Sequence, residues 1–140
     1  MRPIVLDASI VIAWCFDDDA TGIADETIDR MKNAERWIPS LLQIEVTNTL
    51  SRIERKKQTT RRVVREFLGD FESMDLEVDH EAGMRAFQEI YGLCQEFGLT
   101  AYDAVYLELA MRKGAVLATL DQELRRAAVK AGVPVVTVPK

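Results

Sequence analysis

The sequence is poor in the residues that most often build hydrolytic and zinc sites. Among its 140 residues it has one histidine, His80, and two cysteines, Cys15 and Cys94. The cysteines lack CxxC or zinc-type spacing and lie among apolar residues, so we expect buried free thiols rather than a disulfide or a zinc site. His80 precedes a predicted helix and lies far in sequence from the candidate motifs described below, which argues against a histidine general base or a Ser-His triad.

Long apolar runs, repeats and low-complexity tracts are also missing. No apolar run has the length of a membrane span, and the N-terminus lacks the charged region and apolar core of a secretory signal. No Gly/Ser-rich linker divides the chain, and 140 residues, 48% of them hydrophobic, suit one domain better than two. We therefore expect a single domain spanning residues 1–140, soluble and cytoplasmic, with no membrane partner.

Positive charge is scarce overall but concentrated in one segment. The chain has 18 Lys and Arg against 23 Asp and Glu, a net charge of −5, which alone argues mildly against a nucleic-acid partner. One tract reverses this balance: Arg52, Arg55, Lys56, Lys57, Arg61, Arg62 and Arg65. Such a tract could bind phosphates. Taken alone, it is better explained as the solvated face of a helical hairpin that turns at residues 58–60.

Short apolar runs alternate with helical patterns along the chain. The runs predict five buried parallel strands, at residues 3–8, 37–39, 76–78, 115–120 and 134–138. Helical spacing covers residues 21–34, 40–57, 60–74, 80–97, 101–113 and 121–131, with expected stops at Gly98, Gly114 and Gly132. The alternation predicts an α/β fold with right-handed crossovers, in which ligands bind beyond the carboxyl ends of the strands.

Acidic residues stand where such a fold would place a ligand. Asp7 ends the first predicted strand and Asp121 follows the fourth, so their carboxylates adjoin if these strands are neighbours. Glu45 lies on the flank of a helix, about 100° from the centre of its apolar stripe, and Asn48 follows one turn later. Asp103 begins a helix that is apolar on nearly every side, where an ionised carboxylate is costly.

Each acid alone has an ordinary structural explanation. Asp7 or Ser9 could cap the helix that starts at Ile10. Asp121 could cap the helix that follows it, and Asp103 could form a capping box with Thr100. Glu45 would by default be an exposed residue on a helix flank. The combination favours a site, because converging carboxylates repel each other and bind protons unless a cation neutralises them. Oxygen ligands alone suit Mg²⁺ or Mn²⁺ rather than zinc, and a metal-bound water is then the available nucleophile.

Four segments follow one another across the chain: IVLDASIVIAW, PSLLQIEVTNTL, LTAYDAVYLELA and VLATLDQEL. In this order and spacing they resemble the PIN-domain nucleases, specifically the VapC-type toxins of bacterial and archaeal toxin–antitoxin pairs. The resemblance implies an endoribonuclease whose acidic cluster for Mg²⁺ or Mn²⁺ consists of Asp7, Glu45, Asp103 and Asp121. Positions that support the acids or their waters in such proteins are matched by Ser9, Asn48 and Thr119. All the acidic positions are filled, so nothing suggests an inactive copy.

The resemblance also implies an architecture and partners. We expect a twisted parallel sheet of order 3-2-1-4-5 with helices on both faces, a homodimer, and a cognate antitoxin whose tail covers the cleft. The expected reaction is metal-assisted hydrolysis of an RNA phosphodiester bond, in which Asp121 completes the metal shell through water. The basic tract then becomes a contact for RNA or for the antitoxin.

Two other functions are compatible with the same residues. A structure-specific DNA nuclease could use the same acids, because nothing in the sequence visibly reads a 2′-hydroxyl. A regulatory receiver or similar module could hold Mg²⁺ without catalysis. A receiver would need a phosphoacceptor aspartate after the third strand and a facing lysine, whereas Glu77 and Asp79 flank that strand without such a lysine. A phosphatase of the DxD type is disfavoured because residue 9 is serine.

Overall fold

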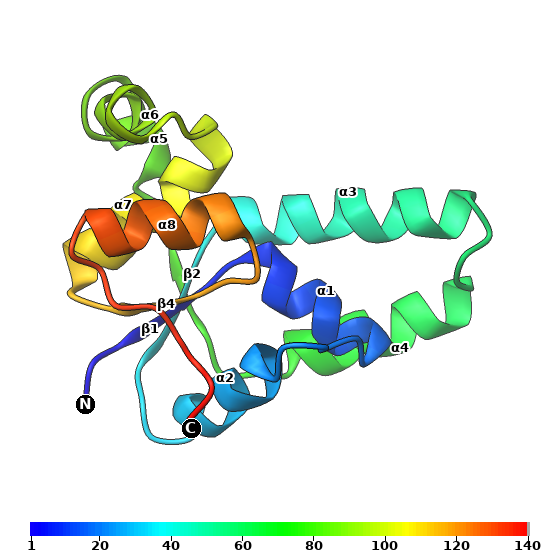
Figure 1. Ribbon diagram of the computed structural model, residues 1–140. Helices are drawn as coiled ribbons and strands as arrows, with labels where there is room; N and C mark the ends of the chain where they lie inside the picture. The colour runs from blue at the N-terminus through cyan, green and yellow to red at the C-terminus, as the bar shows by residue number, and fades with distance from the viewer. Residues whose placement is uncertain (140) are drawn as a thin grey trace.

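The computed structural model describes residues 1–139 and has a parallel sheet with helices on both faces (Figure 1). The sheet order is β3-β2-β1-β4, with β1 at Ile4–Leu6, β2 at Arg36–Pro39, β3 at Glu77–Asp79 and β4 at Val116–Ala118. All pairs are parallel, and Ile4 of β1 pairs with Arg36 on one side and with Val116 on the other. Every residue of β1 and β4 is buried, so these neighbouring strands form the centre of the core.

The helices follow the predicted alternation. They are α1 (Ala8–Phe16), α2 (Ile23–Met31), α3 (Leu41–Arg55), α4 (Arg61–Glu72), α5 (Ala82–Arg85), the π-helical η1 (Ala86–Ile90), α6 (Tyr91–Phe97), α7 (Ala101–Lys113) and α8 (Gln122–Lys130). In Figure 1, α1 and α2 lie on one side of the sheet and α7 and α8 on the other, while α3 and α4 extend away as a hairpin. The predicted α/β class with helices on both faces is confirmed.

The fifth predicted strand is not a strand in the structure. In residues 134–138, Val135 forms a single parallel bridge with Leu117 of β4. The bridge lies beside β4, where the predicted order 3-2-1-4-5 places the last strand. Pairing stops there because Pro134 has no N–H to donate and β4 itself has only three residues. The sheet therefore has four strands in the described residues, and the order of these four agrees with the prediction.

The predicted helix at residues 80–97 is divided into α5, η1 and α6, which follow one another directly. A π-helical turn keeps the chain helical while adding a residue to the turn, so apolar spacing in the sequence does not reveal it. Gly98 and Gly114 end α6 and α7 in the left-handed conformation, with φ of 66° and 60°, as expected for C-terminal stops.

Helix α7 has the burial predicted from its apolar sequence. All residues from Ala104 to Ala110 are buried, and the helix contacts β1, β2 and β4. Cys15 and Cys94 are free, as predicted, but both are only partly buried, so the prediction of buried thiols was too strong. Among residues 1–139, no helix is long and apolar enough to cross a membrane.

Candidate functional site

Adjacent strand ends bring Asp7 and Asp121 to the same hydroxyl group. Because β1 pairs directly with β4, the residues that follow these strands lie side by side, and the Asp7 N–H donates to the carbonyl of Ala118 at 3.1 Å. The Thr119 hydroxyl donates to Asp7 Oδ2 and accepts from the Asp121 N–H at 3.0 Å. The strand ends therefore lie side by side, as predicted, and buried Thr119 joins the Asp7 carboxylate to the main chain of Asp121. That the two carboxylates adjoin stays a prediction.

Asp7 is the most enclosed of the candidate acids, with an exposed fraction of 4%. Its Oδ1 accepts from the Ser9 hydroxyl at 2.6 Å and from the Ile10 N–H at 3.3 Å, so Asp7 also caps α1. Burial raises the pKa of Asp7 to about 6, although the hydrogen bonds from Ser9, Thr119 and Ile10 lower it. Asp7 therefore does cap α1, but capping does not explain all its contacts. A cap needs only Oδ1, whereas the Thr119 hydroxyl also donates to Oδ2 of Asp7.

Asp103 is a half-buried acid, and no hydrogen bond from the described residues offsets the burial of its carboxylate. It lies in the first turn of α7, where its N–H donates to the Thr100 hydroxyl at 3.2 Å. No donor contacts the Asp103 carboxylate in the described part of the chain, so the capping box is only half formed. Burial raises the pKa of Asp103 to about 6, and the negative charges of Asp121, Glu45 and Glu123 raise it as well. Hydrogen bonds from donors would lower the pKa of a carboxylate, and Asp103 receives none from the described residues.

Glu45 forms a hydrogen bond with Tyr106, a residue of the buried helix α7. Glu45 lies partly buried on the flank of α3, as predicted, and its Oε1 accepts from the Tyr106 hydroxyl of α7 at 2.7 Å. Tyr106 is 2% exposed and stands one turn after Asp103. The spacing Asp103-x-x-Tyr106 puts a phenol and an acid on one face of the helix, and this was the available signal.

Two further candidate residues lie at the surface. Asp121 is exposed and caps α8 through the Leu124 N–H at 2.9 Å, which leaves its Oδ2 free of protein donors among residues 1–139. Asn48 is exposed, and its side chain has no hydrogen bond with any described residue. The structure thus joins Ser9 and Thr119 to the acids, as predicted for supporting residues, but gives Asn48 no such contact.

The donor chemistry of this cluster fits a hard divalent cation. All the candidate ligands are carboxylate oxygens, which suit Mg²⁺ or Mn²⁺. The Asp103 carboxylate is surrounded by other acids and accepts no hydrogen bond from residues 1–139. The acids perturb one another electrostatically, yet no three acidic, thiol or imidazole side chains among residues 1–139 lie close enough to hold an ion as they stand. Binding a cation would therefore require some of these carboxylates to move closer together.

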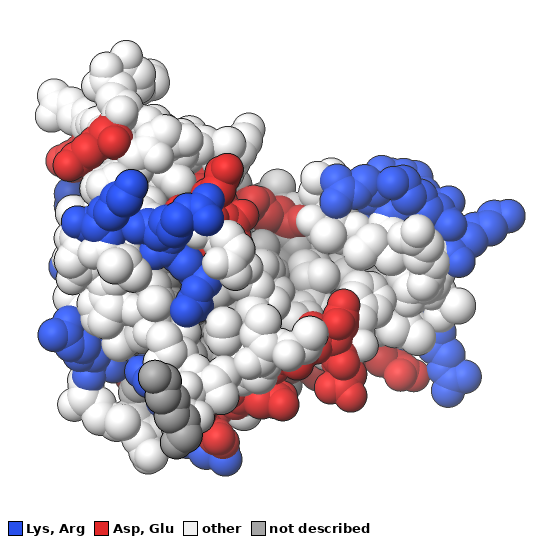
Figure 2. Space-filling model, viewed as in Figure 1, with Lys and Arg blue, Asp and Glu red and all other residues white. Residues whose placement is uncertain are grey.

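The hairpin of α3 and α4 carries a basic surface. The predicted hairpin is confirmed, because α3 ends at Arg55 and α4 begins at Arg61. Its exposed arginines are Arg52, Arg55, Arg61, Arg62 and Arg65. Figure 2 shows Lys and Arg covering the end of this hairpin, while Asp and Glu gather near the beginning of α8, with a hollow between the hairpin and the body of the protein.

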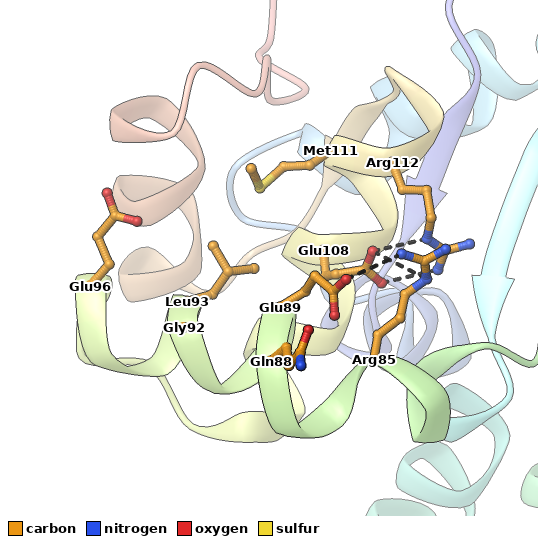
Figure 3. A pocket seen from close by; sticks show the side chains of 9 residues that line it. All are labelled: Arg85, Gln88, Glu89, Gly92, Leu93, Glu96, Glu108, Met111 and Arg112. Carbon is orange, nitrogen blue, oxygen red and sulfur yellow. Dashed lines mark hydrogen bonds and ion pairs between the residues drawn. The ribbon is translucent and has the colours of Figure 1, made fainter.

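A second group of buried acids is paired with arginine, unlike the candidate site. Arg112 of α7 binds both oxygens of Asp79 at 2.8 and 2.9 Å and also contacts Glu81 and Glu108 at 2.9 Å. The hydrogen bonds from Arg112 lower the pKa of Asp79. Figure 3 shows Glu108, Arg112 and Arg85 at a pocket that has residues of η1, α6 and α7 in its walls. The pocket has a volume of about 560 Å³.

This pairing weakens one alternative function. A receiver would use an acid at the end of the third strand as its phosphoacceptor, but Asp79 ends β3 and is held at both oxygens by Arg112. Glu108 is buried and paired with Arg112. We therefore interpret the Arg112 group as a structural link between β3 and α7.

Comparison with known proteins decides the family. A family model described as the PIN domain matches residues 4–130. The chain belongs to the PIN domain family. PIN domains are generally metal-dependent nucleases, which agrees with the resemblance seen in the sequence motifs. A search of curated proteins finds no match.

Solved structures share this PIN fold. The chain is 25% identical to PAE2754 from Pyrobaculum aerophilum, with a TM-score of 0.64 over 96% of this chain and 91% of that chain. It is 17% identical to a chain in the crystal structure of VapBC2 from Rickettsia felis bound to a DNA fragment from their promoter, with a TM-score of 0.66 over 96% of this chain and 97% of that chain. The second similarity shows the fold alone.

Proposed function

We propose that this PIN domain is a metal-dependent endoribonuclease toxin of VapC type that hydrolyses RNA phosphodiester bonds in the cytoplasm. Its ligands for Mg²⁺ or Mn²⁺ would be Asp7, Glu45, Asp103 and Asp121. The observation that carries the proposal is the environment of Asp103, a half-buried carboxylate whose neighbours are acids and whose oxygens receive no hydrogen bond from residues 1–139. A group in this environment is stabilised in its charged form by a cation.

The protein side chains prepare the site in distinct ways. Ser9 and Thr119 hold the two oxygens of Asp7, so its carboxylate has a fixed orientation at the end of β1. The Thr119 hydroxyl also binds the Asp121 N–H, which fixes the start of α8 beside Asp7. The N-terminal end of α7 carries a partial positive charge that favours ionised Asp103. A bound divalent cation would supply an activated water and stabilise negative charge on the phosphate.

The basic hairpin provides a contact surface near these acids. Figure 2 shows Lys and Arg at the end of the hairpin on a face that also carries Asp and Glu near the beginning of α8. A basic surface suits either the phosphates of RNA or an acidic part of an antitoxin. The similarity in fold to VapBC2 from R. felis supports a cognate antitoxin as a partner. We also propose that the protein acts as a homodimer and that the tail of the antitoxin covers the acidic cleft.

The test is cleavage of labelled RNA in Mn²⁺ by the wild type and by Asp7→Asn. We expect the variant to keep the fold and lose activity, because the amide removes a charge from the metal site with little change in volume. Asp70→Asn, which neutralises an exposed aspartate of α4, is the matched control and should cleave like the wild type.

Two results would contradict the proposal. Cleavage by Asp7→Asn at the wild-type rate would refute the assignment of the metal site. Cleavage of single-stranded or duplex DNA without cleavage of RNA would refute the substrate class and favour the DNA nuclease.

A further inference from the structure

The hydrogen bond between Tyr106 and Glu45 joins the two helices that carry candidate acids. The Tyr106 hydroxyl on α7 donates to Oε1 of Glu45 on α3 at 2.7 Å, although the residues are 61 positions apart in the sequence. Asp103 precedes Tyr106 by three positions, so both side chains leave the same face of α7. The bond is therefore a tertiary contact at the acidic cluster rather than a feature of one helix.

Glu45 is the acceptor that satisfies the Tyr106 hydroxyl. The side chain is 2% exposed, and its hydroxyl has no other hydrogen bond among residues 1–139. A buried phenol left without an acceptor would be unfavourable. The Tyr106 hydroxyl is thus the donor and Glu45 its acceptor.

Glu45 has more freedom to leave the cluster than the aspartates do. Its side chain has one more rotatable bond than aspartate, it lies on a helix flank that is partly open to solvent, and the nearby charge of Asp103 repels it. Asp7, by comparison, is fixed by two hydroxyl groups and a backbone N–H. The hydrogen bond from Tyr106 is the contact that restrains the Glu45 carboxylate, and it occupies only Oε1.

We propose that Tyr106 is a positioning residue of the metal centre, which holds Oε1 of Glu45 so that Oε2 is presented to the divalent cation. This inference rests on the proposed function, because it takes Glu45 as a metal ligand. Tyr106 itself would touch neither the cation nor the RNA. Groups that orient ligating side chains in this way typically contribute about 10- to 100-fold to metal affinity.

The test is a calorimetric titration of Mn²⁺ into the wild type, Tyr106→Phe and Tyr102→Phe. Phenylalanine keeps the buried ring and removes only the hydroxyl, so we expect the Kd for Mn²⁺ to rise about 10- to 100-fold in Tyr106→Phe. Tyr102 lies on the same helix, is 61% exposed and should tolerate the same change without effect on the Kd. In a Glu45→Gln background, Tyr106→Phe should change the Kd little, because the carboxylate that it positions is already gone.

The outcomes separate this inference from the proposed function. If the wild type binds Mn²⁺ and Tyr106→Phe binds it equally well, the positioning role is wrong and the proposed function stands. An equal loss of affinity with and without Glu45 would also refute positioning, because the hydroxyl would then act through packing. If the wild type does not bind Mn²⁺, the metal centre and the role of Tyr106 both fail.

A second variant keeps the test valid if Tyr106→Phe does not fold. Glu45→Asp retains the charge and leaves Tyr106 intact, but it withdraws the carboxylate by one methylene from the phenol. We expect a similar loss of Mn²⁺ affinity, and wild-type affinity in this variant would overturn the inference. A hydroxyl with a merely structural role would lower the melting temperature in chelator and leave the Kd for Mn²⁺ unchanged.

Discussion

Neutralising Asp103 should stabilise the protein in chelator, and it should do so only near neutral pH. Burial, with the charges of Asp121, Glu45 and Glu123, raises the pKa of Asp103 from 3.8 to about 6. Because the folded-state pKa is raised, the native state binds more protons than the unfolded chain. The contribution of this group to stability is fully present below about pH 4 and is lost as the pH rises through about 6.

The expected size of the effect follows from this shift. A rise of about two pKa units corresponds to about 3 kcal/mol at about 1.4 kcal/mol per unit, and solvent near this half-buried group reduces the figure to about 1–2 kcal/mol. Asp103→Asn should therefore be about 1–2 kcal/mol more stable than the wild type at pH 7 and nearly equal to it at pH 4. The difference between the two proteins isolates Asp103 from groups such as Asp79, whose lowered pKa has the opposite effect on stability.

Mn²⁺ should reverse the order of stability of the wild type and Asp103→Asn. At a Mn²⁺ concentration a hundredfold above its Kd, binding stabilises the folded wild type by about 2.7 kcal/mol, whereas a variant without the ligand gains little. The assay is urea unfolding followed by circular dichroism, at pH 4 and pH 7, in chelator and in a Mn²⁺ series. Asp70→Asn is the control for removal of an exposed charge. Equal stabilisation of the wild type and Asp103→Asn by Mn²⁺ would show that Asp103 is not a ligand.

Two further predictions concern charged groups outside the cluster. The first variant replaces Arg61, Arg62 and Arg65 of the hairpin with alanine. If the hairpin binds substrate, this variant should bind RNA more weakly and its binding should depend less on salt. Each lost phosphate contact should remove about 0.7 from the slope of the logarithm of the binding constant against the logarithm of the salt concentration. An unchanged slope in a filter-binding series would assign this surface to the antitoxin or to solubility. Replacing Arg112 by methionine should destabilise the protein by about 3–5 kcal/mol in urea unfolding, because it leaves Asp79 and Glu108 buried without their partner. A loss below 1 kcal/mol would contradict that view of the Arg112 group.

The positions of the strand-end residues could be predicted because parallel topology leaves little choice. Residues that follow neighbouring parallel strands must emerge at one edge of the sheet, so Asp7 and Asp121 were expected to adjoin, and Thr119 links them. The burial of α7 could be predicted for a similar reason, since a helix that is apolar on nearly every side has to be enclosed. In both cases local pattern and overall topology agree.

Side-chain contacts between distant segments could not be predicted in the same way. The bond from Tyr106 to Glu45 depends on how α3 and α7 are placed by the sheet, and the link from Arg112 to Asp79 spans 33 residues. No sequence pattern indicates that either pair of residues is in contact. The π-helical turn at Ala86–Ile90 and the reduction of the last strand to a bridge at Val135 were missed because each depends on backbone pairing rather than on apolar spacing.

The two groups of buried acids in this protein are compensated in different ways. Asp79 and Glu108 are neutralised by Arg112, and the pKa of Asp79 is lowered accordingly. Asp7 and Asp103 have raised pKa values because burial is met only by hydroxyl and backbone donors, or by none. An acidic cluster without a basic partner opposes folding at neutral pH, and perturbed groups of this kind gather at functional sites. A fold that pairs one set of acids with arginine and leaves another set unpaired has a place for a cation at the second.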